Sequence, residues 1–211
     1  MSINKLIMEF VGTFFLVLTI GLTVLSPESG VIAPIAIGMV LATMIYAGGH
    51  ISGAHYNPAV TIAVWLRGRC DRADVLPYIV TQVVAATAAA LIVGMLRPGL
   101  PEAAPAALPV GTALVAEFLF TFALAFVVLS VATAKATQGN SYFGIAIGLV
   151  VLAGAFAVGD ISGAAFNPAV AVGVSVMRLA AWNDLWIYLV AQFAGAAVAA
   201  TLFKAIVPGD R

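Results

Sequence analysis

Charged side chains are scarce in this chain. Asp, Glu, Lys and Arg together make up 9% of its 211 residues, and hydrophobic residues make up 63%. A soluble domain carries roughly 25% charged residues. The nine basic and nine acidic residues give a formal net charge of +0, so no charge pattern indicates a nucleic acid or an acidic partner. This composition predicts an integral membrane protein that lies in a lipid bilayer.

Cysteine is nearly absent as well. The single Cys70 permits no internal disulfide and no cysteine-rich metal centre. We expect it to be a bystander on an exposed loop, and we predict neither a metal site nor a cofactor. Near the N-terminus, Glu9 interrupts the first apolar run and further runs follow, so this segment is predicted to be a retained helix rather than a cleaved signal peptide.

Long apolar stretches dominate the rest of the chain. A helix needs about 20 apolar residues to cross the hydrocarbon core of a bilayer. Six stretches meet this length, and small residues recur in them at the spacing that lets membrane helices pack closely. The predicted spans are Lys5–Leu25, Val31–Gly49, Leu76–Leu96, Gly111–Ala134, Tyr142–Val158 and Leu185–Val207. The expected fold is therefore an all-α, multi-pass membrane protein with a single domain.

The distribution of Lys and Arg predicts how the chain is oriented. Six spans place both termini on one side, and the basic residues of cytoplasmic loops outnumber those of outer loops. One side would carry Lys5, Arg67, Arg69, Arg72, Lys135, Lys204 and Arg211, and the other only Arg97 and Arg178. We therefore expect cytoplasmic termini, in a bacterial-type inner (plasma) membrane.

One short motif occurs twice. "ISGAHYNPAV" starts at Ile51 and "ISGAAFNPAV" starts at Ile161, which is 161 − 51 = 110 residues later. The flanking "EFVGTF" and "EFLFTF" repeat in nearly the same register. The sequence thus divides into repeat one (about 1–97), a connecting loop with four prolines (about 98–110) and repeat two (about 111–211). Each repeat holds three spans, so the second must be inverted relative to the first.

Each motif is expected to open a short helix inside the membrane. Asparagine is a preferred N-cap and proline a preferred first helical residue, which predicts helix starts at Asn57-Pro58 and Asn167-Pro168. About ten apolar residues follow each start and end near a basic side chain, which spans roughly half the bilayer core. Irregular backbone at this depth is tolerated only when it is buried or lines a cavity. Two facing helix starts would also repel cations at their meeting point.

The asparagine side chains suggest what these helix starts do. While the carbonyl oxygen accepts the capping bond, the neutral amide nitrogen is expected to donate two hydrogen bonds to a passing solute. The simpler alternative is that the two motifs are only capped turns that hold a helical bundle together.

The doubled NPA motif, each copy preceded by ISGA, resembles the aquaporin (major intrinsic protein) family over nearly the whole chain. The resemblance implies six transmembrane helices plus two re-entrant half-helices in inverted repeats. It also implies a homotetramer with one pore per subunit, passive flux of water and small uncharged solutes, and no enzymatic activity. It assigns the pore-lining positions to Asn57, Pro58, Ala59, Asn167, Pro168 and Ala169.

The same resemblance assigns a second constriction, the selectivity filter, where this chain departs from most water channels. By the spacing of the family, the filter positions fall on Ile37, Ala155, Ala164 and Val170. All four are apolar, and Val170 stands where most water channels have arginine. Valine here resembles the plant vacuolar branch. This filter implies a wider pore that passes water and possible further solutes such as ammonia, hydrogen peroxide, urea, glycerol or metalloid acids.

Two carboxylates at matching positions leave a second function open. Glu9 and Glu117 are predicted inside membrane helices, where an ionisable group is a functional candidate. They would either support the re-entrant loops, which the resemblance implies, or relay protons in a coupled transporter of a small neutral substrate. A scaffold protein with a vestigial pore is a third possibility. His50, His55 and Asp160 flank the motifs, and we expect packing or loop hydrogen bonding from them rather than gating.

Overall fold

The chain forms helices joined by short connections in the part that the structure, a computed structural model, describes: residues 2–26, 28–98 and 107–210. Six of its helices are long and apolar enough to span a membrane, and two are short. The main helices are α1 (Ile3–Val24), α2 (Ala33–Ser52), α3 (Pro58–Leu66), α4 (Arg72–Leu96), α5 (Val110–Val128), α6 (Phe143–Ser162), α7 (Pro168–Val176) and α8 (Leu185–Ile206). The predicted six spans and two half-helices are confirmed in order and kind.

Several predicted boundaries are wrong by a few residues, each for a local reason. α2 and α6 run beyond the predicted ends at Gly49 and Val158, because they end only where Gly53 and Gly163 adopt left-handed conformations, with φ of 87° and 82°. A glycine adopts positive φ at little cost and commonly ends a helix. α4 starts before the predicted Leu76, because its first turn is polar and a count of apolar residues misses it.

The predicted fourth span, Gly111–Ala134, changes its geometry near the end. α5 ends at Val128 and continues as a π-helical turn, Leu129–Thr133. Such turns are rare and are often found near functional sites. The middle of the predicted connecting loop, residues 99–106, lies outside the described residues.

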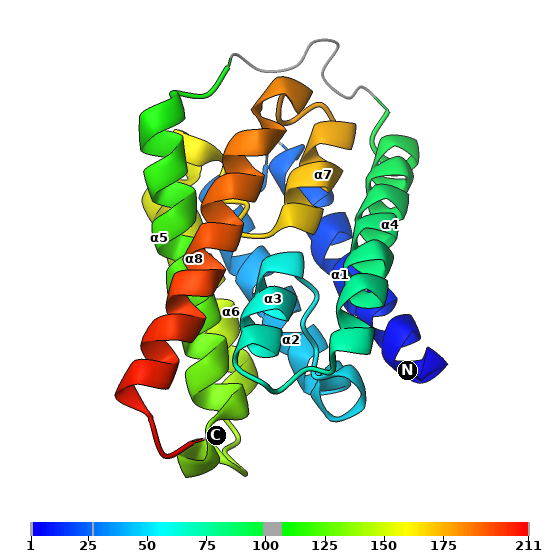
Figure 1. Cartoon of the computed structure of the whole chain (residues 1–211). Helices are drawn as coiled ribbons and strands as arrows, with labels where there is room; N and C mark the ends of the chain where they lie inside the picture. The colour runs from blue at the N-terminus through cyan, green and yellow to red at the C-terminus, as the bar shows by residue number, and fades with distance from the viewer. Residues whose placement is uncertain (1, 27, 99–106, 211) are drawn as a thin grey trace.

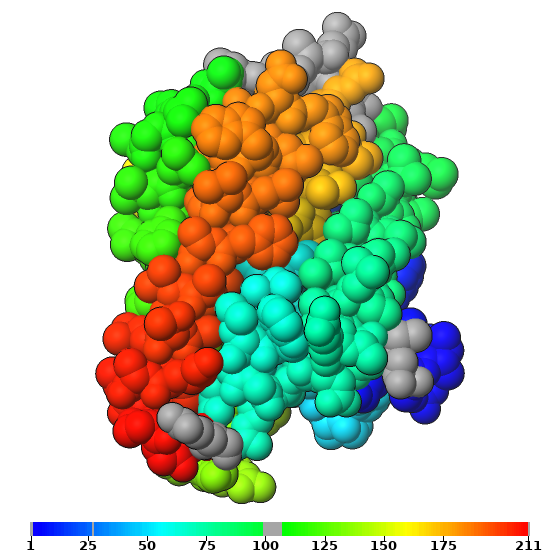
Figure 2. All heavy atoms as spheres, viewed as in Figure 1, coloured from blue at the N-terminus to red at the C-terminus, as the bar shows by residue number. Residues whose placement is uncertain are grey.

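Inverted repeats explain how the helices are arranged. Figure 1 shows the short helix α3 in the half of the molecule that holds both chain termini, and α7 in the opposite half. Within each repeat the first helix packs against the second and third, α1 on α2 and α4, and α5 on α6 and α8. The half-helices α3 and α7 lie between α4 and α8, as the space-filling view also shows on one face (Figure 2). Each short helix is thus surrounded by long ones.

Small residues let the two repeats approach closely. At the crossing of α2 and α6, a Cβ atom added to Gly38 would lie 2.7 Å from the backbone oxygen of Gly148, closer than carbon and oxygen can approach. α4 and α8 carry buried alanines along the same stripe, Ala85, Ala86, Ala89 and Ala90 on one and Ala191, Ala196, Ala199 and Ala200 on the other. Close packing of this kind replaces the hydrophobic drive that lipid does not provide.

Candidate functional site

The two half-helices begin with identical caps. Asn57 Oδ1 accepts hydrogen bonds from Ala59 N at 2.8 Å and Val60 N at 3.4 Å. Asn167 Oδ1 accepts from Ala169 N at 2.9 Å and Val170 N at 3.4 Å. Both asparagines have extended backbone, and proline follows each as the first helical residue. The predicted helix starts are therefore confirmed.

The two caps also bind each other's segment. Asn57 Nδ2 donates to Phe166 O at 2.9 Å, and Asn167 Nδ2 donates to Tyr56 O at 2.9 Å. The half-helices therefore meet start to start, with an approximate twofold symmetry. The expectation that each amide offers two donors to a solute is wrong, because one N–H of each amide is bound to the opposite repeat. One N–H per asparagine remains for the pore.

Glu9 organises the first re-entrant segment. Its Oε1 accepts from Ser52 Oγ at 2.7 Å and His55 N at 3.0 Å. Its Oε2 accepts from Tyr56 N at 2.7 Å and Gln82 Nε2 at 2.8 Å. The side chain is fully buried, yet four donors satisfy it, as a buried carboxylate requires.

Glu117 repeats this arrangement in the second half. Its Oε1 accepts from Ser162 Oγ at 2.7 Å and Ala165 N at 2.9 Å. Its Oε2 accepts from Phe166 N and Gln192 Nε2, both at 2.8 Å. Both carboxylates therefore bind the backbone that precedes a half-helix, and neither lines the cavities described below.

Several partners in these networks were missed as functional residues. Gln82 and Gln192 donate to the carboxylates, and Tyr78 and Tyr188 donate through their hydroxyls to Ser52 O and Ser162 O. A signal existed, because both pairs are 110 residues apart (192 − 82 and 188 − 78). Polar residues repeated in register within apolar spans identify groups that hold the re-entrant backbone.

The re-entrant segments adopt an unusual backbone. Ala54, Tyr56, Ala164 and Phe166 have positive φ values of 53°, 51°, 50° and 49°. Such conformations are costly for residues other than glycine and persist where surrounding contacts hold them. The carboxylates take the N–H groups, so the carbonyl groups of residues 53–55 and 163–165 are left without a hydrogen bond within the described part of the chain. The same residues line cavities, where these oxygens can accept hydrogen bonds from a solute.

A small, mostly apolar cavity of 270 Å³ lies between the repeats. Asn57 and Asn167 line it, and so do all four predicted filter residues, Ile37, Ala155, Ala164 and Val170. These four come from α2, α6, the second re-entrant segment and α7. Further apolar side chains of this cavity include Leu16, Ile20, Leu41, Leu124, Val151 and Val174. Beyond the asparagines, the wall offers few polar side chains.

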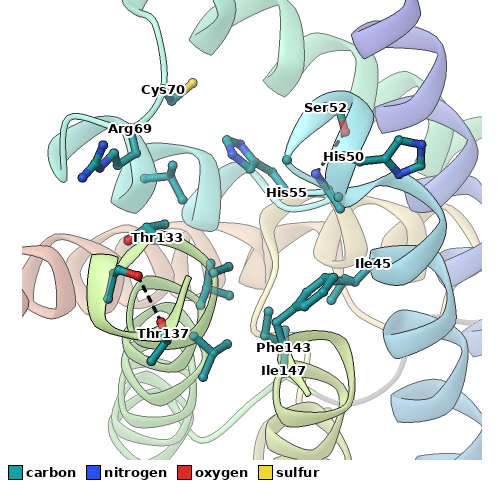
Figure 3. Close-up of a pocket in the computed structure, with 18 of the residues that line it drawn as sticks. Ile45, His50, Ser52, His55, Arg69, Cys70, Thr133, Thr137, Phe143 and Ile147 are labelled. Atoms are coloured by element: carbon teal, nitrogen blue, oxygen red, sulfur yellow. Dashed lines mark hydrogen bonds between the residues drawn. The ribbon is translucent and has the colours of Figure 1, made fainter. Parts of the chain in front are cut away.

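A larger cavity of 1060 Å³, lined by more polar residues, lies at the end that holds the chain termini. We call it the vestibule. His55 lines both cavities and joins them, while its Nδ1 lies 3.1 Å from Thr61 Oγ1. Figure 3 shows Ile45, Phe143 and Ile147 on one side of the vestibule, Thr133 and Thr137 on another, and Arg69 at the edge with its guanidinium turned outward. The two cavities therefore adjoin each other, and the one between the repeats reaches the asparagines.

The residues that flank the motifs differ in their surroundings. His55 is buried, and its ring is bonded to Thr61 of α3. His50 and Asp160 are exposed near the ends of α2 and α6, and neither side chain is seen in a hydrogen bond with another described residue. The expectation that they pack or bond within loops is therefore wrong for these two. Exposure at a helix end lets water solvate them instead.

Cys70 is less exposed than expected. It is half-buried in the α3–α4 connection and lines the vestibule, with its Sγ 3.6 Å from Asp71 O. Burial, followed by the nearby Asp74 carboxylate, raises the pKa of its thiol to about 11. The neutral thiol is therefore the stable form at neutral pH, and the residue reacts slowly with electrophiles.

These features define a class of protein. Two half-helices that start at one another inside a bundle of six spans, with a cavity passing their tips, form a membrane channel. The family model for "Major intrinsic protein" matches residues 1–203. The chain belongs to the major intrinsic protein family, and it is a passive channel for water and small neutral solutes rather than an enzyme.

Curated relatives agree over almost the whole chain. It is 35% identical over 218 residues to "Aquaporin NIP1-4" of Oryza sativa subsp. japonica, covering 99% of this chain and 79% of that one. It is 35% identical over 201 residues to "Probable aquaporin NIP4-2" of Arabidopsis thaliana, covering 91% and 70%. These relatives are plant proteins, so the expected bacterial-type inner membrane is not supported. The coarser expectation of a multi-pass integral membrane protein is confirmed.

A solved structure has the same fold. The aquaglyceroporin from Plasmodium falciparum is similar with a TM-score of 0.82 and 23% identity, covering 98% of this chain and 97% of that one. At this identity the likeness bears on the fold alone.

Proposed function

We propose that solutes cross the membrane in single file through the cavity between the repeats, past Asn57 and Asn167. The observation that carries this proposal is the pair of reciprocal bonds between the half-helix tips, at 2.9 Å each, beside a cavity that both asparagines line. The remaining amide N–H groups and the unpaired carbonyl groups supply the hydrogen bonds that a solute loses on leaving water. The positive ends of the two half-helices oppose the entry of cations.

Ile37, Ala155, Ala164 and Val170 are proposed as the outer constriction. They offer no side-chain donor, and two of them are alanine, so this part of the pore is wide and apolar for the family. Solutes beyond water are accordingly proposed, from the set of ammonia, hydrogen peroxide, urea, glycerol and metalloid acids. The filter resembles that of the vacuolar branch, whereas the relatives named above are NIP-type aquaporins.

The coupled-transporter alternative is not favoured. Each candidate proton carrier, Glu9 and Glu117, already accepts four hydrogen bonds from the protein. Protonation of either carboxylate would place a proton where a donor now points. A relay group needs a route to the solute, and neither residue lines a cavity.

Flux through reconstituted protein tests the channel. Vesicles that contain the protein are expected to swell or shrink in an osmotic gradient with a rate that rises linearly with the gradient. Imposing a pH gradient should leave this rate unchanged. Saturation at low solute concentration, or dependence on the pH gradient, would favour a transporter, and no flux of any solute would favour a scaffold.

Substitution of Val170 tests the filter. Val170→Arg places a long cationic side chain in the cavity and adds donors, so permeation of urea or glycerol is expected to fall more than that of water. The measurement is a stopped-flow panel of solutes on the same vesicles. Val174→Arg would be a poor control because it lines the same cavity, so Val115, which is exposed on α5, serves as Val115→Leu. Equal solute permeation in Val170→Arg and the parent would remove Val170 from the constriction.

The assembly and its orientation are also proposed. We expect a homotetramer with one pore per subunit, and termini on the cytoplasmic side, because the basic residues gather at that end of the molecule. Chemical cross-linking of the protein in its membrane tests the first point, and a ladder that stops at a dimer would contradict it.

A further inference from the structure

The C-terminal tail makes a contact that the pore described so far does not use. Asp210 follows α8 and its carboxylate joins two walls of the vestibule. Oδ1 lies 2.9 Å from Arg67 Nη2 and accepts from Arg69 Nη2 at 3.1 Å, while Oδ2 accepts from Lys135 N at 2.7 Å. Arg67 and Arg69 follow the end of the first half-helix, and Lys135 follows the π-helical turn of α5. We call this group of four residues the clasp.

The clasp lies behind the wall of the vestibule rather than in its opening. Arg69 and Lys135 line the vestibule, whereas Asp210 and Arg67 do not. Figure 3 accordingly shows the guanidinium of Arg69 turned away from the cavity. The carboxylate therefore draws the cationic end of Arg69 out of the solute path.

Burial makes this contact costly to lose. The Arg67 side chain is 2% exposed and that of Asp210 is 6% exposed. Arg67 also lies over the ring of Phe203, with 4.8 Å from its guanidinium carbon to the ring centroid. Among the described residues, neither Nε nor Nη2 of Arg67 has a hydrogen-bond partner, so the ion pair with Asp210 provides the charge that compensates the guanidinium. A buried cation without its counterion is destabilised and moves toward water.

The second wall of the vestibule depends on the same carboxylate. The π-helical turn Leu129–Thr133 is kept in place by Thr137 Oγ1, which donates to Ser130 O at 2.8 Å, and by Asn140 Nδ2, which donates to Val131 O at 2.7 Å. Asp210 adds a third tie, at Lys135 N. Val131, Ala132 and Thr133 of this turn line the vestibule. Because a π turn has weaker intrinsic preference than an α-helix, its position depends on such external bonds.

We propose that Asp210 is a positioning residue of the pore, which holds the vestibule open by retaining Arg69 and the end of α5 away from the solute path. This inference rests on the channel function proposed above. Release of the carboxylate lets the Arg69 guanidinium turn into the vestibule and lets the α5–α6 connection shift inward. The C-terminal tail is thereby part of the conducting structure, and loss of its contacts closes the vestibule.

The groups around Asp210 determine the conditions under which the contacts of the clasp break. Arg67 and Arg69 face it with their guanidinium groups, and Lys135 faces it with its backbone N–H. On α8, Lys204 donates to Leu66 O at 3.4 Å. The hydrogen bond from Lys135 N, then Arg67 and Arg69, hold the pKa of Asp210 below its usual value. The contacts of the clasp are therefore kept at physiological pH. Removal of the tail, or of the charge of Asp210, breaks them.

The test uses the full chain in proteoliposomes and three variants. Asp210→Asn is expected to lower water permeability several-fold, because the amide cannot compensate two guanidinium groups. The double variant Arg69→Gln with Asp210→Asn removes the side chain that obstructs the path, so its permeability is expected to recover toward that of the parent. Glu28→Gln, which removes one negative charge at an exposed position, is the matched control and is expected to conduct normally.

A second readout keeps the test independent of flux. Cys70 is the single cysteine of the chain and lies next to Arg69, so its rate of reaction with a maleimide in detergent reports the movement of this wall. Asp210→Asn is expected to raise that rate, while Asp210→Glu, which keeps the carboxylate, should raise it less. Parent-like permeability together with a parent-like labelling rate in Asp210→Asn would overturn the proposal. Low permeability that the double variant does not restore would overturn the role of Arg69. If the parent protein conducts nothing, the channel function fails, while the labelling rates still test the clasp.

Discussion

At the scale of single residues, the two buried glutamates decide whether the pore can form. Each places its carboxylate oxygens against four donors, of which two are backbone N–H groups of the segment before a half-helix. Hydrogen bonds to a carboxylate are stronger than those between neutral groups. They offset the cost of four positive φ values in the re-entrant segments. The glutamates therefore act on the solute path through the backbone.

Glu117→Gln tests this role. Each carboxylate oxygen of Glu117 accepts hydrogen bonds from two donors. In the variant, an NH₂ group replaces one of these oxygens, so its N–H donors face two other donors. Each buried donor left unsatisfied costs about 1–3 kcal/mol, so the variant is expected to unfold at a clearly lower temperature and to lose flux. Thermal unfolding followed by circular dichroism in detergent measures the first effect. If Glu117 were instead a proton relay, the site would have to accept a neutral carboxyl group. Gln would then fit as that group does, and the unfolding temperature would be unchanged.

The tail carboxylate supplies a prediction on pH. Because the pKa of Asp210 is lowered in the folded protein, its charge stabilises the fold above the unfolded value, about 3.9 for Asp, and this stabilisation is lost as pH falls through the folded value. The difference in unfolding temperature between the parent and Asp210→Asn should be constant from pH 8 to about 5 and shrink in stronger acid. A difference that disappears already near pH 6 would show that another group, rather than Asp210, is responsible.

Single residues also show where sequence reasoning succeeds and where it stops. The caps at Asn57 and Asn167 follow from local chemistry, so they were predictable. The bond from each amide to the opposite repeat was not, because it depends on where a segment about 110 residues away ends up. His55 and Thr61 are a similar case. Both are replaced by alanine in the second repeat, at 165 and 171, and only the structure shows that they contact each other.

At the scale of elements, the half-helices depend on their neighbours for stability. Nine residues are too few for an isolated helix to be stable in water. α3 and α7 persist because their caps are satisfied and because α4 and α8 cover them. The Asn-Pro caps and the apolar stretches after them could therefore predict that these helices exist, but not which long helices enclose them. The π turn at the end of α5 had no sequence signal, since its hydrogen-bond partners come from the connection that follows.

The crossing of α2 and α6 gives a prediction for a pair of elements. Gly148→Ala adds a Cβ that would collide with the backbone oxygen of Gly38, so the two helices must separate. Overpacking of this kind costs about 1–3 kcal/mol, and the unfolding temperature is expected to fall. Gly111→Ala is the matched control, because its added Cβ meets nothing within 4 Å and alanine favours the helix. Equal losses in the two variants would mean that helix propensity, rather than close contact, matters at 148.

At the scale of the whole molecule, the inverted repeat makes one pore from two similar halves and leaves the ends different. The half opposite the termini holds the proposed filter positions, while the half with the termini holds the vestibule and the clasp. The halves share the carboxylate networks that support the re-entrant segments, although His55 and Thr61 of the first are alanine in the second. The proposed filter and the clasp lie near opposite mouths, where the two halves differ most.

This asymmetry leads to a prediction about orientation in the membrane. Cys70 lies at the end of the molecule that carries both termini, so the expected orientation places it in the cytoplasm. A bulky, membrane-impermeant maleimide should label Cys70 in inside-out vesicles and not in right-side-out vesicles. Because the pKa of this thiol is about 11, labelling should be slow at pH 7 and accelerate as pH rises toward that value. A Cys70→Ser variant sets the background, and labelling from the outer side of sealed right-side-out vesicles would reverse the orientation and move the vestibule and its clasp to the external face.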